Sequence, residues 1–220
     1  MRTAFLLPKA LAFSFFLVAC SSSADPGKEG ASASDAPKVQ KDLSTHAVAY
    51  FAAGCFWCVE EVFESVKGVE EAVSGYSGGT EQDPTYRQVG SGATGHAEAV
   101  AVYYDPLKVS YKELLVVFFC SQDPTTPNRQ GPDAGPQYRS AIFYETEDQK
   151  REAEAYIAKL EAEKTFNAPI VTEVVPYIKF WPAEDYHQDY VRQHPEEGYV
   201  RAVSIPRFER FKAACPEFLK

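Results

Sequence analysis

The chain has little positive charge and almost no methionine. It carries 22 Lys and Arg against 31 Asp and Glu, which gives a formal net charge of -9 and an isoelectric point near 5.0. A surface of this sign repels phosphates, so we exclude nucleic acid as a partner. Met1 is the only methionine. Once an N-terminal segment is removed, the chain therefore has no methionine side chain that oxidants could modify.

Cysteine and histidine are too few, and too scattered, for a structural metal site. There are five cysteines and four histidines, and Cys55 and Cys58 form the single Cys-x-x-Cys pair. A zinc site needs about four ligands at paired spacings, and no second such pair and no His-x-x-x-His is present. We therefore expect no metal ion, and interpret His96 and His187 as isolated side chains.

A short hydrophobic run lies near the N-terminus. The run "LAFSFFLV" spans residues 11–18, follows Arg2 and Lys9, and precedes Cys20. Eight residues cannot cross a bilayer core of roughly 30 Å as a helix, so the pattern indicates an export signal. It resembles a bacterial lipoprotein signal over residues 1–19, which implies that Cys20 is lipidated. The alternative is a plain signal peptide with an unrelated cysteine.

The export signal predicts a place outside the cytoplasm. With lipidated Cys20 as a membrane tether, we expect the bacterial periplasm or cell envelope. Residues 20–43 are rich in Ser, Ala, Gly, Pro and charge and have no apolar period, which predicts a flexible polar tether. The remaining residues 44–220 have enough apolar material for one catalytic domain. Nothing in the sequence requires more than a monomer.

Beyond the tether, strand-like and helix-like patterns alternate. Apolar runs predict strands over residues 46–54, 69–79, 95–105, 138–146 and 169–180. Helical spacing predicts helices over residues 56–68, 110–123 and 147–164, the second opened by a Ser110 cap and closed before Pro124. Residues 125–137 are dense in Pro and Gly and predict a loop. The pattern is that of an α+β domain.

The segment "GCFWCVEEVF" holds the one cysteine pair. Cys55 lies where the first strand gives way to a helix, and a helix N-terminus favours thiolate over thiol. Cys58 lies one turn later on the same face and could form a disulfide with Cys55. Spacing alone leaves open a structural bridge, or two buried cysteines on an apolar face.

Three longer segments resemble the signature blocks of the A-type peptide methionine sulfoxide reductases. They are "GCFWCVEEVFESVKGVEEAVSGYSGG", "YRQVGSGATGHAEAVAVYYDP" and "FFCSQDPTTPNRQGPDAGPQYRS", followed more weakly by "YIKFWPAEDYHQDY". The resemblance implies a ferredoxin-like two-layer sandwich of a mixed β-sheet with helices. It also implies reduction of methionine S-sulfoxide, in proteins and as the free amino acid, without a cofactor.

The resemblance also assigns roles to residues. Cys55 matches the nucleophile, whose thiolate attacks the sulfoxide sulfur and is left as a sulfenic acid. Glu98 matches the acid, with a pKa raised by burial. Tyr86 and Tyr138 match phenols that bind the sulfoxide oxygen, and Asp133 matches a carboxyl group that holds this network.

Two aromatic residues between the cysteines match the family's pocket for the substrate methyl group. Phe56 and Trp57 would hold the methyl while the phenols hold the oxygen, which selects one sulfoxide epimer.

The chain departs from the family in its resolving cysteine. Many relatives have glycine where this chain has Cys58, and carry a cysteine where this chain has Val200. Cys58 is our first candidate for the resolving thiol, and Cys215 the second. Cys120 ends an apolar run, and we interpret it as a packing residue. An external dithiol of the thioredoxin type would restore the enzyme, or could even resolve the sulfenic acid directly.

The alternative function is thiol:disulfide exchange by Cys55 and Cys58 on client proteins. An exchange protein needs neither an acid nor phenols that bind an oxygen. Glu98, Tyr86, Tyr138 and Asp133 therefore distinguish the two hypotheses.

Overall fold

A computed structural model describes residues 42–220. The predicted export signal over residues 1–19, the lipidation site Cys20 and the tether as far as residue 41 lie outside the described residues. Within the described part, no helix has the length and apolar character needed to cross a membrane.

A six-stranded mixed sheet forms the centre of the described chain. Its strand order is β7-β6-β1-β3-β2-β8. All neighbouring strands pair antiparallel except β6 and β7, which are parallel. The strands are β1 (Ala47–Ala53), β2 (Val69–Ser77), β3 (Ala97–Tyr104), β6 (Ser140–Tyr144), β7 (Glu173–Pro176) and β8 (Phe180–Pro182).

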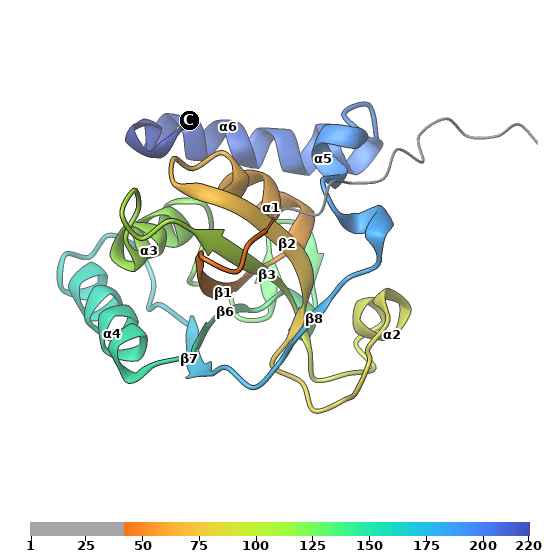
Figure 1. The fold of residues 1–220 in the computed structure, drawn as a ribbon, viewed down its shortest axis with the longest axis horizontal. Helices are drawn as coiled ribbons and strands as arrows, with labels where there is room; N and C mark the ends of the chain where they lie inside the picture. The colour runs from red at the N-terminus through yellow and green to blue at the C-terminus, as the bar shows by residue number, and fades with distance from the viewer. Residues whose placement is uncertain (1–41) are drawn as a thin grey trace, which may run out of the picture. The chain divides into compact units, whose positions relative to one another are not determined.

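The central part of this sheet has the ferredoxin-like arrangement. The chain runs β1, α1 (Phe56–Glu64), β2, β3, α3 (Tyr111–Cys120), β6, and the four central strands lie in the order β6-β1-β3-β2. The predicted α+β fold is confirmed (Figure 1). A further helix, α4 (Glu147–Ala162), follows β6, and the short α2 (Tyr86–Gly90) lies between β2 and β3.

Alternation along β1 divides the core between the two faces of the sheet. Phe51 faces the helices, where its ring stacks on Phe63 of α1 and Phe118 of α3, each with centroids 5.1 Å away. Tyr50 points to the other face, where its ring stacks on Tyr177 at 4.2 Å. Burial of these large aromatic side chains, each contributing about 1.5–3 kcal/mol, fixes the register of β1.

The predicted cap of α3 is confirmed. The Ser110 side chain accepts a hydrogen bond from the Glu113 amide, and the Glu113 carboxylate in turn accepts from the Ser110 amide at 2.7 Å. This capping box satisfies amides that the first turn of a helix leaves unpaired.

The single strand predicted over residues 169–180 is wrong. The segment makes two strands at opposite edges of the sheet: β7 pairs with β6, and β8 pairs with β2. Pro176 has no amide hydrogen for a ladder and ends β7. Gly75 permits β8 to approach, because a Cβ there would lie 2.3 Å from the Phe180 ring.

The predicted loop over residues 125–137 contains a small hairpin. Its strands are β4 (Arg129–Gln130) and β5 (Asp133–Ala134), and the 3₁₀ turn η1 (Pro136–Tyr138) follows.

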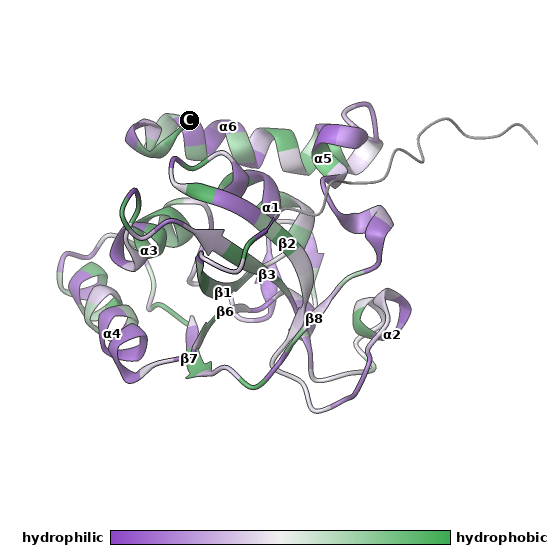
Figure 2. Ribbon diagram, viewed as in Figure 1, coloured by the Kyte–Doolittle hydropathy of each residue, from purple (hydrophilic) through white to green (hydrophobic). Residues whose placement is uncertain are grey.

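The C-terminal part folds back over α1, which sequence patterns did not predict. It consists of η2 (Asp185–His187), α5 (Tyr190–Gln193), the π-helical turn η3 (Val200–Ser204), α6 (Ile205–Ala214) and η4 (Pro216–Phe218). Helix α6 packs on α1 (Figure 1). Figure 2 shows hydrophobic and hydrophilic residues alternating along α6, as an amphipathic helix requires.

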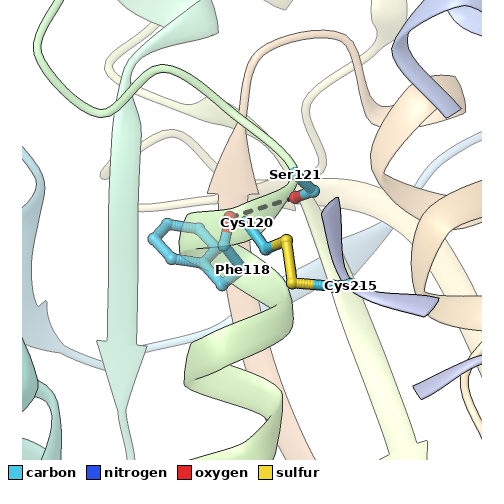
Figure 3. Close-up of a disulfide and its surroundings, with 4 residues drawn as sticks. All are labelled: Phe118, Cys120, Ser121 and Cys215. Atoms are coloured by element: carbon cyan, nitrogen blue, oxygen red, sulfur yellow. Dashed lines mark hydrogen bonds between the residues drawn. A yellow bond between two sulfur atoms is a disulfide. The ribbon is translucent and has the colours of Figure 1, made fainter. Parts of the chain in front are cut away.

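A disulfide joins Cys120 at the end of α3 to Cys215 after α6 (Figure 3). The prediction that Cys120 is a free packing residue is therefore wrong, and Cys215 is not a free thiol that could resolve a sulfenic acid. The two residues are 95 positions apart. The folding of α6 across the domain brings them together, and sequence spacing carries no signal of it.

We predict that this disulfide contributes about 2–4 kcal/mol to the free energy of unfolding, because it closes a long loop in the unfolded chain. Cys120→Ala, Cys215→Ala and the double variant should each lose this amount in urea unfolding. Either single substitution already removes the whole disulfide. The free energy of unfolding of the double variant should therefore be lower than that of either single variant by no more than about 1 kcal/mol. Additive losses would instead mean that the two side chains contribute by packing separately.

Candidate active site

Cys55 lies at the N-terminus of α1, as predicted. Gly54 turns the chain from β1 into the helix with φ +82, a conformation that favours glycine. A Cβ at Gly54 would also lie 2.5 Å from Cβ of Gln130 in the β4-β5 hairpin. Cys55 is the N-cap residue, is 7% exposed and has a free thiol.

Cys58 lies one turn further along α1 and also has a free thiol. Its amide donates to the Cys55 carbonyl at 3.1 Å, and each thiol shifts the pKa of the other. On its other side, the Cys58 sulfur lies 3.2 Å from the hydroxyl oxygen of Ser204. A separation of one helical turn allows the pair to form a disulfide.

The two thiols differ in acidity. Burial raises the pKa of Cys55 well above its usual value, and its contact with Cys58 raises it further. The hydrogen bond from Cys55 lowers the pKa of Cys58 to about 6, helped by the charge of Arg207 and by Ser204. Their surroundings therefore make Cys58 the more acidic thiol of the pair.

Glu98 projects from β3 to the beginning of α1. It is 1% exposed, and its Oε2 accepts a hydrogen bond of 3.0 Å from the Phe56 amide. Burial raises the pKa of this carboxyl to about 8; the Phe56 amide opposes the shift, while the charges of Asp133 and Cys58 add to it. Glu98 is therefore protonated at neutral pH.

Two phenols lie close to this carboxyl. Burial, followed by the charges of Glu98 and Cys55, raises the pKa of Tyr86 to about 12. Burial and the charges of Glu98 and Tyr86 raise the pKa of Tyr138 as well. Tyr86 opens α2 and Tyr138 ends η1, so the fold brings them together from separate segments. Both phenols keep their protons at neutral pH and can donate hydrogen bonds.

Asp133 holds a phenol that sequence patterns did not single out. The Tyr199 hydroxyl donates to Oδ2 of Asp133 and also lowers the pKa of the Cys55 thiol. Burial raises the pKa of Asp133, whereas Tyr199 and Arg207 lower it. A phenol has one proton, so Tyr199 can donate to Asp133 or to Cys55, but not to both at once.

Phe56 and Trp57 are the first residues of an aromatic wall. Phe56 is buried, and its ring lies 6.1 Å from Tyr86 and 5.0 Å from His187 between centroids. Trp57 is half-buried, stacks on Tyr190 at 3.7 Å, and donates from Nε1 to Nδ1 of His187 at 3.0 Å. The C-terminal segment thus fixes the orientation of the Trp57 ring.

The side chains at this site that sequence patterns missed all come from the C-terminal segment: His187, Tyr190, Tyr199, Ser204 and Arg207. The only available signal was the weak "YIKFWPAEDYHQDY" resemblance, which contains His187 and Tyr190. An isolated histidine is too common for assignment without its partner, the Trp57 indole.

A group of carboxylates lies on another face of α1. Glu60, Glu64 and Asp189 each place an oxygen within 4.8 Å of the others. The Glu60 oxygens already accept from the Ser74 hydroxyl and the Asp189 amide, both at 2.9 Å. Arg192 pairs with Glu64 and Asp189. We interpret the group as an ion-pair network that fastens the C-terminal segment to α1.

The residues around Cys55 form three functional sets. A thiol pair can be oxidised to a disulfide, a buried carboxylic acid can donate a proton, and phenols can bind an oxygen beside an aromatic wall. This combination suits removal of an oxygen atom from a substrate with an apolar end.

Comparisons with known proteins agree with this chemistry. A protein-family model described as peptide methionine sulfoxide reductase matches residues 47–217. The peptide methionine sulfoxide reductase MsrA of Picrophilus torridus is 50% identical over 165 residues, covering 75% of this chain and 93% of the relative. The MsrA of Ralstonia nicotianae is 51% identical over 168 residues, covering 74% and 88%.

Solved structures give the same result. Methionine sulfoxide reductase A of Corynebacterium diphtheriae superposes with a TM-score of 0.61 at 36% identity, covering 68% of this chain and 76% of that chain. Mxr1 from Saccharomyces cerevisiae in reduced form superposes with a TM-score of 0.66 at 30% identity, covering 73% and 92%.

Proposed function

Because this chain belongs to the A-type peptide methionine sulfoxide reductase family and is an oxidoreductase that reduces methionine sulfoxide, we propose a mechanism in which Cys55 attacks the sulfur of methionine S-sulfoxide. One observation carries this proposal. The fold brings the buried acid Glu98 and the phenols Tyr86 and Tyr138 to the N-terminus of α1 beside the thiol.

Recognition divides the sulfoxide between an apolar side and a polar side. The methyl group packs on Phe56 and Trp57, whose ring is held by His187. The oxygen lies among the hydroxyls of Tyr86 and Tyr138 and the acid of Glu98. Interchange of methyl and oxygen would bury the oxygen against rings that cannot hydrogen-bond it, which disfavours the R epimer.

The first step transfers the oxygen. As the Cys55 sulfur attacks the sulfoxide sulfur, its proton passes to Cys58, and Glu98 gives its proton to the sulfoxide oxygen. The bond from substrate sulfur to oxygen breaks and a bond from Cys55 sulfur to oxygen forms. Methionine leaves with its sulfur reduced by two electrons, and Cys55 becomes a sulfenic acid, oxidised by the same two.

The second step closes a disulfide. Cys58 passes its proton to the Glu98 carboxylate and attacks the Cys55 sulfur; the displaced oxygen takes that proton and departs as water. Cys215 is a poor candidate for this role. It is held by Cys120, and it lies eleven residues beyond Ser204, a distance of about 16 Å along a helix.

An external dithiol completes the cycle. Exchange with the Cys55–Cys58 disulfide regenerates both thiols and leaves the donor oxidised, which is the chemistry of a thioredoxin-like protein. We include such a protein as the partner, with oxidised proteins and free methionine sulfoxide as substrates.

The predicted export signal supports a location of this cycle outside the cytoplasm. The short apolar run, the basic residues before it and Cys20 after it support a lipid-anchored enzyme in the bacterial cell envelope. The Cys120–Cys215 disulfide supports the same location, because disulfides persist in oxidising compartments.

A single turnover without external reductant tests the reaction. The reduced Cys20→Ser enzyme, mixed with excess methionine S-sulfoxide, should release about one equivalent of methionine and form a Cys55–Cys58 disulfide, whereas the R epimer should release none. Methionine is measured by mass spectrometry, and the disulfide by peptide mapping. Cys58→Ser should still release methionine but retain a Cys55 sulfenic acid. Failure of both epimers would instead favour disulfide exchange.

The rate of methionine release should depend on pH with two limbs. It should rise as the cysteine pair loses its first proton near pH 6 and fall above pH 8 as Glu98 loses the proton it donates. Glu98→Gln keeps an oxygen for the Phe56 amide but has no acid proton. This variant should be slower by at least about 100-fold and lose the alkaline limb.

Exchange with a small aromatic disulfide serves as the control, because it needs no acid. Glu98→Gln should perform it at close to the wild-type rate. A Glu98→Gln enzyme that releases methionine as fast as the wild type would exclude Glu98 as the proton donor.

Lipidation is testable in a bacterial host. The full chain should incorporate a labelled fatty acid and begin at Cys20. It should also fractionate with membranes, because two or more acyl chains give stable anchoring. The Cys20→Ser variant should lose the label and become soluble. An unlabelled wild-type protein with a different N-terminus would identify a plain signal peptide.

A further inference from the structure

A buried arginine acts through its charge on Cys58, the proposed resolving thiol, and the mechanism above does not use it. Arg207 is 6% exposed, and its Nε donates to the Ser121 carbonyl at 2.8 Å. Its Nη1 would be 3.6 Å from a Cβ at Gly54, so the guanidinium reaches the turn before Cys55. Its Nη2 is buried without a hydrogen-bond partner among the described residues. A buried cation with an unused donor normally faces an anion.

Ser204 belongs to the same C-terminal segment and touches the same thiol. Its hydroxyl oxygen lies 3.2 Å from the Cys58 sulfur. Ser204 ends η3 and Arg207 lies three residues later in α6, so both side chains leave this segment on one side. That side faces α1, on which α6 packs.

We propose that Arg207 and Ser204 form an anion site for the Cys58 sulfur, so that Cys58 closes the disulfide as a thiolate. This inference rests on the proposed function and assigns its second step. Ser204 donates directly to the reacting sulfur, whereas Arg207 is a positioning residue that acts through its charge. When Cys58 is a thiolate, the Ser204 hydroxyl is the donor in their contact.

The groups that face Cys58 explain why a cation is needed there. Cys55 lies on its own helix, Glu98 on β3, Asp133 on β5, and Tyr199 before η3. Each of these groups is neutral or negative, and Asp133 raises the pKa of Cys58. The charge of Arg207 lowers that pKa and also lowers that of Asp133.

The structure holds Arg207 firmly in this place. Its contact at Ser121 immediately follows Cys120, which is joined by the disulfide to Cys215 beyond the end of α6. Two attachments from α6 thus converge on the end of α3. The disulfide therefore serves the active site indirectly, by fixing the helix that carries the cation.

The first experiment titrates Cys58 without substrate. In a Cys20→Ser, Cys55→Ser background, Cys58 is the only one of the five cysteines outside the disulfide that remains. Thiolate absorbance at 240 nm then gives its titration midpoint. Adding Arg207→Gln should raise the midpoint by at least about one pH unit, and Ser204→Ala by a smaller amount. Arg207→Lys should restore most of the wild-type value.

Arg210→Gln is the matched control, because it removes a positive charge from an exposed position of the same helix. Its midpoint should equal that of the parent. Circular dichroism and thermal unfolding establish that each variant is folded. An unchanged midpoint in folded Arg207→Gln, or an equal shift in Arg210→Gln, would overturn the proposal.

The second experiment follows disulfide closure in single turnovers of the Cys20→Ser enzyme by rapid alkylation and mass spectrometry. A less acidic thiol is deprotonated less often, but its thiolate is more nucleophilic. Arg207→Gln should close the disulfide several-fold more slowly than the parent at pH 6, and at least as fast at pH 9. A loss that is the same at every pH would indicate a merely structural role.

Methionine release, recorded in the same samples, tests the reductase reaction separately. Its absence in the parent would refute the proposed function, whatever the Cys58 titration shows.

Discussion

The hydrogen bond from the Phe56 amide to Glu98 is the contact on which the site depends. It joins the first turn of α1 to the central strand β3. It thereby fixes Glu98, the proposed acid, close to Cys55, the proposed nucleophile. The close antiparallel pairing of β1 with β3 makes this contact possible, because it places the end of β1 next to the strand that carries Glu98.

Burial has opposite uses for the groups gathered there. It keeps Glu98 protonated, with a pKa of about 8, so that the group can serve as an acid near neutrality. The same burial disfavours a thiolate on Cys55. Cys58 carries a negative charge more readily than Cys55, because Cys55 itself, the Arg207 guanidinium and the Ser204 hydroxyl lower its pKa. In the proposed mechanism, Cys55 can therefore remain buried, because Cys58 accepts its proton.

The C-terminal segment supplies side chains of the site that the central sheet and α1 do not provide. It supplies His187 and Tyr190 to the wall behind Trp57, Tyr199 to Asp133 and Cys55, and Ser204 to Cys58. A segment with so many contacts at the site needs to be fixed in place. The Glu60 network anchors it at one point, and the Cys120–Cys215 disulfide anchors it at another.

The sequence by itself determined the central strands and helices, the position of Cys55 at a helix N-terminus, and the family resemblance that pointed to Glu98, Tyr86, Tyr138, Asp133, Phe56 and Trp57. These features are local, because strand alternation, helix caps and signature blocks are each readable within a few residues of one another. The tertiary structure decided the rest. It divided residues 169–180 between two sheet edges, paired Cys120 with Cys215, placed Ser204 against Cys58, and joined Arg207 to the end of α3. Contacts between residues that lie about 90 to 150 positions apart arise from how α6 and β8 pack on the core, and no short sequence pattern encodes that packing.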